Sequence, residues 1–510
     1  MKKIISEWKW GILGGLAILL LALFLRLYNL TLLPVFVDEA IYIRWSQIMI
    51  NESTLRFIPL SDGKQPLFMW ATMGALKLFS DPLFAGRFIS VLAGVGTLVG
   101  VFAVSYYLFK SPKVALIASF IYALSPFAVF FDRLALVDSL LSFFGIWTFF
   151  FALVTFETRR LDMAMITGFI LGLAALTKSP ALFFAVLLPA VAIFTIKKPL
   201  HLIKLAGLFT VIYLIAFAMY NILRLGPNFH LLSLRNFDYV YPYSHFLERP
   251  LDPFKGHMGG IWNYFILLLP LPVFFLALGG IVVNFRLNFK KIALLTIWGI
   301  FPILVIAEYS KVVTARYIFF VLPFIFILAA SAFLTKEKWT MKLVILTLLG
   351  FGVFSIFFNW KLLTKPEEAG LPHGERNGYL EEWTAGQGIV EIANFVKEEH
   401  VKNPTKKIVV GTEGYFGTLP NGLEMYLEGV ENVVVIGVGL GIREIPTSLK
   451  ESKEAGNKTY LVVNQSRLSE NPDNMGLKLI SSYPKPLRKV GSKEYSEKGP
   501  QETLFFFEVK

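Results

Sequence analysis

Carboxylate and basic side chains recur at the ends of long apolar runs in this chain. The pair Asp38 and Glu39 in "VDEA" comes shortly after the first such run, and Lys64 follows in "KQPL". The chain has no Cys, and its six His are scattered without the spacing of metal ligands. Any chemistry therefore rests on carboxylates, Lys and Arg. The candidate site residues are Asp38, Glu39, Lys64, Arg133, Asp138, Lys178 and Arg316.

The elements that must position these residues are membrane helices. Hydrophobic residues make up 55% of the 510 residues and charged residues 17%, and the mean hydropathy is +0.60. Such values are typical of an integral membrane protein. Because a spanning helix needs roughly 20 apolar residues, we predict about eleven spans, of which the fifth and sixth are short enough for a tilted or re-entrant pair. The predicted spans are 10–30, 85–108, 114–131, 136–155, 162–177, 181–196, 203–222, 261–283, 292–307, 317–334 and 342–360.

Short loops rich in Lys and Arg indicate how the chain is oriented. They fall on alternate ends of the predicted spans, and loops of this kind tend to stay cytoplasmic. We therefore predict a multi-pass protein of the cell membrane, with a cytoplasmic N-terminus, a retained first span, and residues 31–84 and 361–510 outside. The net charge of +13 then reflects topology and requires no nucleic acid. The loops are "MKKIISEWKW", "FKSPK", "ETRR", "IKKPLHLIK", "NFRLNFKK" and "TKEKWTMK".

A change in composition near residue 360 predicts two domains: a membrane domain of residues 1–360 and an extracytoplasmic α/β domain of residues 361–510. In the second domain, helical stretches alternate with short apolar runs typical of strands. Its "GVGLG" at Gly437 to Gly441 lacks the full glycine fingerprint and a following acidic residue, which favours a simple turn over a nucleotide-binding loop. The predicted strands are "KKIVVG", "NVVVIGVG", "TYLVVN" and "ETLFFFEVK".

The candidate residues all fall on the predicted outer side of the membrane. Carboxylates beside a bilayer are costly to place in hydrocarbon and are often functional. Structural roles are the alternative. Glu39 would then be a solvated neighbour of Asp38 or a helix N-terminal acid, and Arg133 would pair with Asp138 or an adjacent carboxylate. Lys178 and Arg316 would extend their charged ends to the interface.

The order of these motifs resembles a known family. The acidic pair after the first span, the "KQPL" loop, the "RLALVD" stretch and the late "ARYIFF" are similar to the C-type (GT-C) glycosyltransferases. Within them the chain resembles glycosyltransferase family 39, the dolichyl-phosphate-mannose protein mannosyltransferases and their relatives that transfer aminoarabinose to lipid A. The resemblance covers residues 10–360. The mannosyltransferases carry a β-trefoil domain in an outer loop, and no loop here has a suitable length, so protein O-mannosylation is not implied.

The resemblance implies a GT-C fold and a hexosyl- or pentosyltransferase that depends on a polyprenyl-phosphate sugar. It implies that Asp38, with Glu39 beside it, is the catalytic base and that Lys64 contacts the lipid phosphate. The further phosphate-binding residues would be Arg133, Lys178 and Arg316. Asp138 would shape the site or bind the acceptor.

The chemistry of such a donor supports these roles independently. A polyprenyl tail needs a membrane groove, and its charged head needs a polar site at the membrane edge. Displacing phosphate from the anomeric carbon needs a base, which contributes about 10²–10⁴-fold in rate, and cations for the leaving phosphate. With a single base the displacement would invert the anomeric centre. We expect no required cofactor and no metal site, although Asp38 and Glu39 could also bind a divalent cation.

Two other classes of protein are alternatives. A polytopic transporter or flippase would also have charges within its spans. Here, however, the charges lie at the predicted outer surface of the membrane, and the two halves of the sequence show no repeated pattern. A membrane-anchored binding protein would leave the outer charges unexplained. We therefore expect three partners: a polyprenyl-phosphate sugar donor, an extracytoplasmic acceptor and the lipid bilayer. We also expect the tail domain to dock on the outer loops and to position the acceptor.

Overall fold

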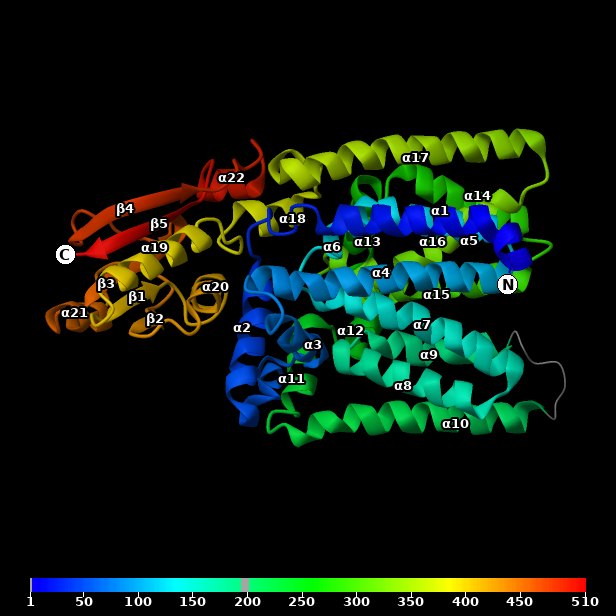
Figure 1. The fold of residues 1–510 in the computed structure, drawn as a ribbon, viewed down its shortest axis with the longest axis horizontal. Coiled ribbons are helices and arrows are strands. Elements are labelled where there is room, and N and C mark those ends of the chain that lie inside the picture. The colour runs from blue at the N-terminus through cyan, green and yellow to red at the C-terminus, as the bar shows by residue number, and fades with distance from the viewer. Residues whose placement is uncertain (1, 194–200) are drawn as a thin grey trace. The chain divides into compact units, whose positions relative to one another are not determined.

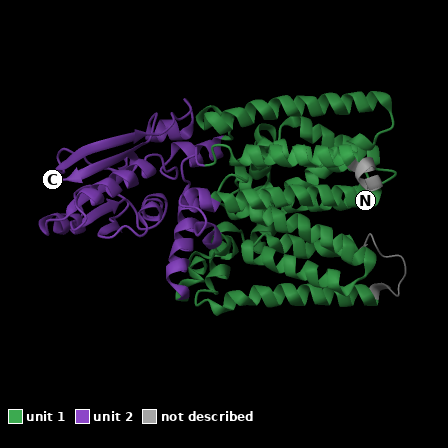
Figure 2. Ribbon diagram, viewed as in Figure 1, with its two compact units in different colours: residues 1–30, 54–71, 87–372 green, residues 31–53, 72–86, 373–510 purple. Residues whose placement is uncertain are grey.

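The computed structural model describes residues 2–193 and 201–510. The chain divides into two compact units, which Figure 2 shows in different colours. Unit 1 comprises residues 1–30, 54–71 and 87–372, and unit 2 comprises residues 31–53, 72–86 and 373–510. Unit 2 thus combines the polar tail with two segments from the N-terminal part of the chain.

Membrane helices form most of unit 1 (Figure 1). In lipid every backbone N–H and C=O must be satisfied within the segment, so long apolar runs form helices. Among the described residues, seven helices are long and apolar enough to cross a membrane, or eight if the bent pair α13–α14 is one span. The long helices are α1 (Lys2–Leu27), α4 (Pro82–Phe109), α7 (Val137–Thr158), α10 (His201–Tyr220), α15 (Phe289–Tyr309), α16 (Leu322–Ser331, preceded by a 3₁₀ segment, Ala315–Val321) and α17 (Lys338–Thr364), and the bent pair is α13 (Phe254–Leu268) and α14 (Leu271–Asn284).

The number of long spans is lower than the predicted eleven. Three of the predicted runs fall on apolar helices that are shorter than a full span: α5 (Pro112–Leu124), α8 (Leu161–Thr177) and α9 (Ala181–Ile193). The run predicted at 114–131 is divided because Pro126 cannot continue α5 and instead begins α6 (Pro126–Phe131). Helix α8 still packs against α7 and α10. The predicted mainly α polytopic membrane fold is confirmed, with this correction to the lengths.

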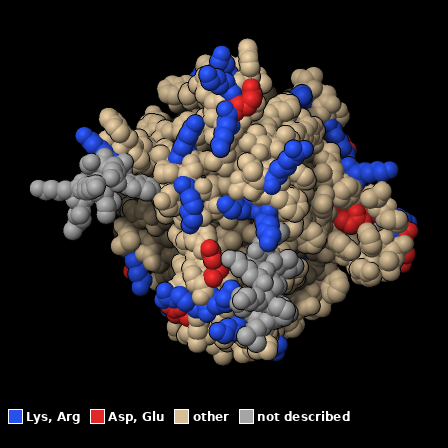
Figure 3. Space-filling view, turned by 90° about the vertical axis from the view of Figure 1, so that its right-hand side faces the viewer, with Lys and Arg blue, Asp and Glu red and all other residues tan. Residues whose placement is uncertain are grey.

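One end of unit 1 is strongly cationic. The Lys291 ammonium lies 5.8 Å from the centre of the Phe109 ring, and that of Lys113 lies 5.4 Å from the Phe333 ring. These contacts bring the loops after α4, before α15 and after α16 to the same end. Figure 3 shows many Lys and Arg and few Asp and Glu on this face. The predicted cationic loop "IKKPLHLIK" lies largely outside the described residues.

A topology experiment follows from this cationic end. Because cationic loops tend to stay cytoplasmic, a reporter fused after Lys113 is expected on the cytoplasmic side and one fused to the C-terminus on the opposite side. Paired fusions to an enzyme active only outside the cytoplasm and to a fluorescent protein active only inside measure this directly. Signals from the same side would contradict the predicted orientation.

A five-stranded sheet with helices on both faces organises unit 2. The strand order is β2-β1-β3-β5-β4; β1 is parallel to β2 and β3, and β5 is antiparallel to β3 and β4. Alternate residues point to opposite faces. Leu461 and Phe507 pack with Leu449 of α21, whereas the Tyr460 ring lies 5.8 Å from that of Phe395 in α19. The elements are β1 (Ile408–Thr412), β2 (Val433–Gly437), β3 (Lys458–Asn464), β4 (Leu477–Pro484), β5 (Thr503–Val509), α18 (His373–Arg376), α19 (Ile389–Lys402), α20 (Thr418–Leu427), α21 (Thr447–Glu454) and α22 (Lys493–Lys498).

The glycine run after β2 serves a close backbone approach. A Cβ at Gly437 would lie 2.3 Å from the carbonyl oxygen of Gly414, so a larger residue would not fit. The next helix, α21, begins only at Thr447. No helix N-terminus therefore follows the glycines directly, as a nucleotide-binding loop requires.

Helix α2 (Val37–Asn51), from the first outer loop, packs on α20 within unit 2. Arg44 Nε donates to Glu424 Oε2 at 3.2 Å, and Gln47 Nε2 donates to the Met425 carbonyl oxygen at 2.9 Å. The rings of Trp45 and Phe416 lie 5.7 Å apart. Helix α2 and the tail residues of α20 therefore belong to one packed unit, whereas the location of the tail outside the membrane stays a prediction.

Candidate functional site

An ion pair between Asp138 and Lys178 lies at the end of unit 1 opposite its cationic face. Asp138 stands in the first turn of α7, and Lys178 directly follows α8. Because α7 has 22 residues, it separates Asp138 from the cationic face by about 30 Å. Lys178 Nζ lies 2.6 Å from Asp138 Oδ1, and the Asp138 side chain is 3% exposed. A buried carboxylate of this kind holds the ammonium in a fixed position.

Two further segments meet this ion pair. Gln65 Nε2 donates to Ser179 Oγ at 2.9 Å, which ties the "KQPL" loop to the residue after Lys178. The Lys178 ammonium also lies 4.8 Å from the centre of the Tyr317 ring, which follows Arg316. We call Lys64, Asp138, Lys178 and Arg316 the outer cluster, after the side of the membrane on which the sequence predicts them. Four segments that are distant in sequence are thus brought together, and Lys64 and Arg316 each stand next in sequence to a residue that makes one of these contacts.

A second oxygen of Asp138 is unused. Within the described part of the chain, Asp138 Oδ2 is buried and has no hydrogen-bond partner. Buried polar atoms normally find a partner, and an exception needs an explanation. A hydroxyl group of a bound substrate would supply a hydrogen-bond donor for Asp138 Oδ2.

A tight turn presents Lys64. The 3₁₀ segment Ile58–Asp62 ends at Gly63, which has φ of +66°. A Cβ at Gly63 would lie 2.5 Å from the Cβ of Arg235, so only glycine fits. Lys64 Nζ lies 3.3 Å from Asp62 Oδ2, and its side chain is 22% exposed. The ammonium is thus held at the surface of the turn, where a phosphate could reach it.

Arg133 has a different environment from the one we predicted. Its guanidinium is buried and donates to four carbonyl oxygens at the end of α1, at distances of 2.7 to 3.1 Å. A cation at a helix C-terminus satisfies unpaired carbonyls and the helix dipole. The carboxylate that we had considered as its alternative partner, Asp138, pairs with Lys178 instead. These contacts support the structural alternative for Arg133, at the end of α1, and its role at the donor phosphate is not part of the proposed function. The four acceptors are Leu25, Arg26, Tyr28 and Asn29.

A second buried ion pair, between Arg26 and Asp132, lies near the end of α1. Arg26 Nε donates to Asp132 Oδ2 at 2.9 Å, and both side chains are fully buried. Tyr122 Oη donates to the same oxygen at 3.0 Å. The sequence offered a signal for this pair, since Arg26 interrupts the first apolar run, but we did not single out Arg26. The contacts of Gln65 and Tyr317 were not predicted either, because a single Gln or Tyr gives no sequence signal for catalysis or phosphate binding.

Asp38 and Glu39 lie in the first turn of α2, in unit 2. Glu39 is fully buried, and its Oε2 accepts a hydrogen bond from the Phe36 backbone N–H at 3.0 Å. It therefore caps the start of α2, as in a capping box. Asp38 is partly exposed. The neighbouring carboxylates thus have different environments, and Asp38 is the better placed of the two to meet a substrate.

A divalent cation is an alternative ligand for Asp38 and Glu39. Among the described residues no group of three or more His, Asp or Glu side chains is arranged to hold a metal ion. One oxygen of Glu39 is already used by the helix cap. The metal independence of the protein stays a prediction.

Comparison with solved structures identifies the class of fold. ArnT from Cupriavidus metallidurans is similar in the apo state (15% identity, 98% of both chains, TM-score 0.58) and bound to undecaprenyl phosphate (14% identity, 98% of both chains, TM-score 0.59). AglB from Archaeoglobus fulgidus, an archaeal oligosaccharyltransferase in complex with an inhibitory peptide and a dolichol-phosphate, is also similar (13% identity, 90% of this chain and 70% of that chain, TM-score 0.51). The chain thus has an ArnT-like GT-C fold.

Comparison with sequence families points in the same direction. Residues 63–221 match the family described as dolichyl-phosphate-mannose-protein mannosyltransferase. This region includes three members of the outer cluster, Lys64, Asp138 and Lys178. No curated protein sequence matches the chain significantly. The predicted resemblance to the GT-C glycosyltransferases and family 39 is confirmed.

Proposed function

We propose that the protein is a glycosyltransferase that moves a sugar from a polyprenyl-phosphate donor to an extracytoplasmic acceptor. The observation that carries the proposal is the outer cluster, because contacts of Lys178, Ser179, Gln65 and Tyr317 bring the segments of Lys64, Lys178 and Arg316 to one end of a GT-C helix bundle, where a lipid phosphate would arrive. The relatives bound to undecaprenyl phosphate and to a dolichol-phosphate support a ligand of this class. The acceptor is a lipid, a glycan or a protein.

The residues have distinct roles in this reaction. Lys64, Lys178 and Arg316 neutralise the donor phosphate, and Asp138 fixes the Lys178 ammonium. Asp38 accepts the proton of the acceptor hydroxyl. The acceptor oxygen bonds to the anomeric carbon, the bond from that carbon to the phosphate oxygen breaks, and the electron pair leaves with the polyprenyl phosphate. Because attack and departure occur on opposite faces, the anomeric centre inverts.

The reaction can be tested by following both products. Membranes that contain the protein are supplied with a polyprenyl-phosphate sugar carrying a labelled sugar. A transferase releases polyprenyl phosphate as the label enters an acceptor. Mass spectrometry of surface glycans and lipids, with and without the protein, then names sugar and acceptor. Labelled donor that crosses the membrane intact, without release, would instead identify a transporter or flippase.

Lys64→Ala is expected to reduce transfer by about ten- to hundredfold, because a hydrogen bond to a charged group contributes about 1.5–3 kcal/mol. The loss should be shared between donor affinity and turnover, since the ammonium meets the phosphate both before and during bond breaking. Titration with undecaprenyl phosphate and single-turnover transfer measure the two parts. Lys77→Ala, at an exposed Lys outside the cluster, is the matched control. Equal activity of the two variants would remove Lys64 from the site.

A further inference from the structure

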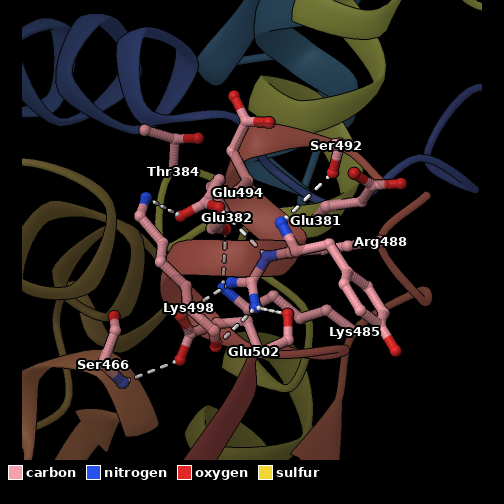
Figure 4. Close-up of polar contacts among 12 residues, drawn as sticks. Glu381, Glu382, Thr384, Ser466, Lys485, Arg488, Ser492, Glu494, Lys498 and Glu502 are labelled. Atoms are coloured by element: carbon pink, nitrogen blue, oxygen red, sulfur yellow. Dashed lines mark hydrogen bonds and ion pairs between the residues drawn. The ribbon is translucent and has the colours of Figure 1, made fainter. Parts of the chain in front are cut away.

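A network of buried ion pairs lies in unit 2 (Figure 4). Arg488 Nε lies 3.1 Å from Glu382 Oε1, and its Nη2 lies 3.2 Å from Glu502 Oε2. Lys498 Nζ lies 2.8 Å from the other oxygen of Glu382. Glu382, Arg488 and Glu502 are almost fully buried. The network therefore joins the segment after α18 to the region between β4 and β5.

Lys485 holds the backbone of the same segment. Its Nζ donates to the carbonyl oxygens of Glu382 and Ala385, each at 2.8 Å, and the residue is 1% exposed. Burial lowers the pKa of Lys485 to about 8, although nearby carboxylates oppose this shift. The buried Lys485 ammonium donates two hydrogen bonds to backbone carbonyls. These bonds fix the backbone path of residues 382–385, because moving the carbonyls away would leave buried N–H donors unpaired at a cost in free energy. Residues 382–386 are thus fastened from one side by Lys485 and Arg488.

The other side of residues 382–386 pairs with the residues just before Asp38. The Val37 N–H donates to the Thr384 carbonyl oxygen at 3.0 Å, and the Gly386 N–H donates to the Val35 carbonyl oxygen at 2.8 Å. Phe36 and Ala385 form an antiparallel bridge between them. Val37 is the first residue of α2, and Asp38 is the second. The path of residues 382–386 therefore sets where α2 begins.

We propose that Lys485 and Arg488 are positioning residues that aim Asp38 through residues 382–386. The proposal rests on the proposed function for the role of Asp38. It explains why charged side chains, rather than apolar ones, fill this part of unit 2. Apolar residues would pack but would leave the carbonyl oxygen of Ala385 without the donor that Lys485 supplies, and would remove the second donor to the carbonyl oxygen of Glu382, which also accepts from the Ala385 N–H. Lys485 and Arg488 then contribute to catalysis through the start of α2, without themselves contacting the substrate.

Lys485→Met tests the first half of this connection in the full chain. It keeps the length of the side chain and removes both donors. Amide hydrogen exchange of residues 35–40 and 382–388 should rise at least tenfold, whereas exchange in β1 should not change. Lys478→Met in β4 removes an exposed ion pair with Glu508 of β5 and should leave exchange in both regions unchanged. Unchanged exchange at residues 35–40 in Lys485→Met would overturn the proposal.

Val37→Pro tests the second half and remains informative if Lys485→Met unfolds unit 2. Proline is favoured at the first position of a helix, and Phe36 already has the extended backbone that a following proline requires, with φ of −92° and ψ of 152°. The variant therefore preserves α2 and removes the N–H that bonds to Thr384. Val37→Ala retains this N–H and is the matched control.

Activity separates positioning from stability. Both Lys485→Met and Val37→Pro should lower turnover by tenfold or more while the KM for donor and the affinity for undecaprenyl phosphate stay within twofold of the unmodified protein. Full turnover by Val37→Pro would overturn the proposal and leave the proposed function intact. An unmodified protein that transfers no sugar would overturn the proposed function, and hydrogen exchange would still decide whether residues 382–386 hold the start of α2.

Discussion

Replacing Asp38 by Asn is expected to lower sugar transfer by about 10²–10⁴-fold, the usual contribution of a general base. The amide has nearly the same volume and still forms hydrogen bonds, but it does not accept the proton of the acceptor hydroxyl at neutral pH. Insertion in the membrane and affinity for undecaprenyl phosphate should not change, because the residues that we propose to bind the phosphate are Lys64, Lys178 and Arg316. Single-turnover transfer by purified, detergent-solubilised protein measures the effect.

Glu39→Gln is the matched control for this experiment. The Gln side chain retains a carbonyl oxygen that accepts the Phe36 N–H, the contact that Glu39 makes at the start of α2. Transfer is therefore expected to fall by no more than a fewfold. If Glu39→Gln were as damaging as Asp38→Asn and added divalent cation restored it, a metal at the pair would replace the base. Near-normal transfer by Asp38→Asn would remove the base from the mechanism.

The helices of unit 1 could be predicted because lipid imposes one rule on every span. Any long apolar run must satisfy its own backbone, so hydropathy alone located the helices. Their lengths were less predictable, because Pro126 divides a run that is apolar throughout. In unit 2, four predicted strands match β1, β2, β3 and β5, but β4 was missed. Its sequence "LKLISSYP" is an edge strand with a bulge after Leu479, so only part of it is buried.

The site could be predicted in its residue types but not in its pairings. Asp138 and Lys178 are 40 residues apart, and only the packing of α7 beside α8 and α9 brings them to one ion pair. For Arg133 the sequence left a functional and a structural role open. A cation at the outer end of a span looks the same in sequence whether it meets a phosphate or the carbonyls of a helix end. The sequence is equally ambiguous for Glu39. A carboxylate that caps a helix and a catalytic carboxylate can stand at the same place in a sequence, just after a turn.

Arg26→Met is expected to have the largest effect on stability. The Arg26–Asp132 pair is fully buried, with a separation of 2.9 Å. Removing one partner of a buried pair typically costs about 3–5 kcal/mol, because the remaining charge has no counterion. The carboxylate left by Arg26→Met would retain the Tyr122 hydroxyl as a donor, which does not neutralise its charge. Thermal unfolding in detergent should therefore shift to markedly lower temperature.

The double variant Arg26→Met/Asp132→Asn shows whether this loss comes from the stranded charge. Replacing a whole buried pair by neutral side chains of similar size is often close to neutral, so the double variant should recover most of the thermal stability that Arg26→Met loses. Arg160→Met, which removes an exposed ion pair with Asp162, should have little effect because water screens that pair. If the double variant were as unstable as Arg26→Met, the stability would come from the packing of the Arg26 side chain at the end of α1 and not from its charge.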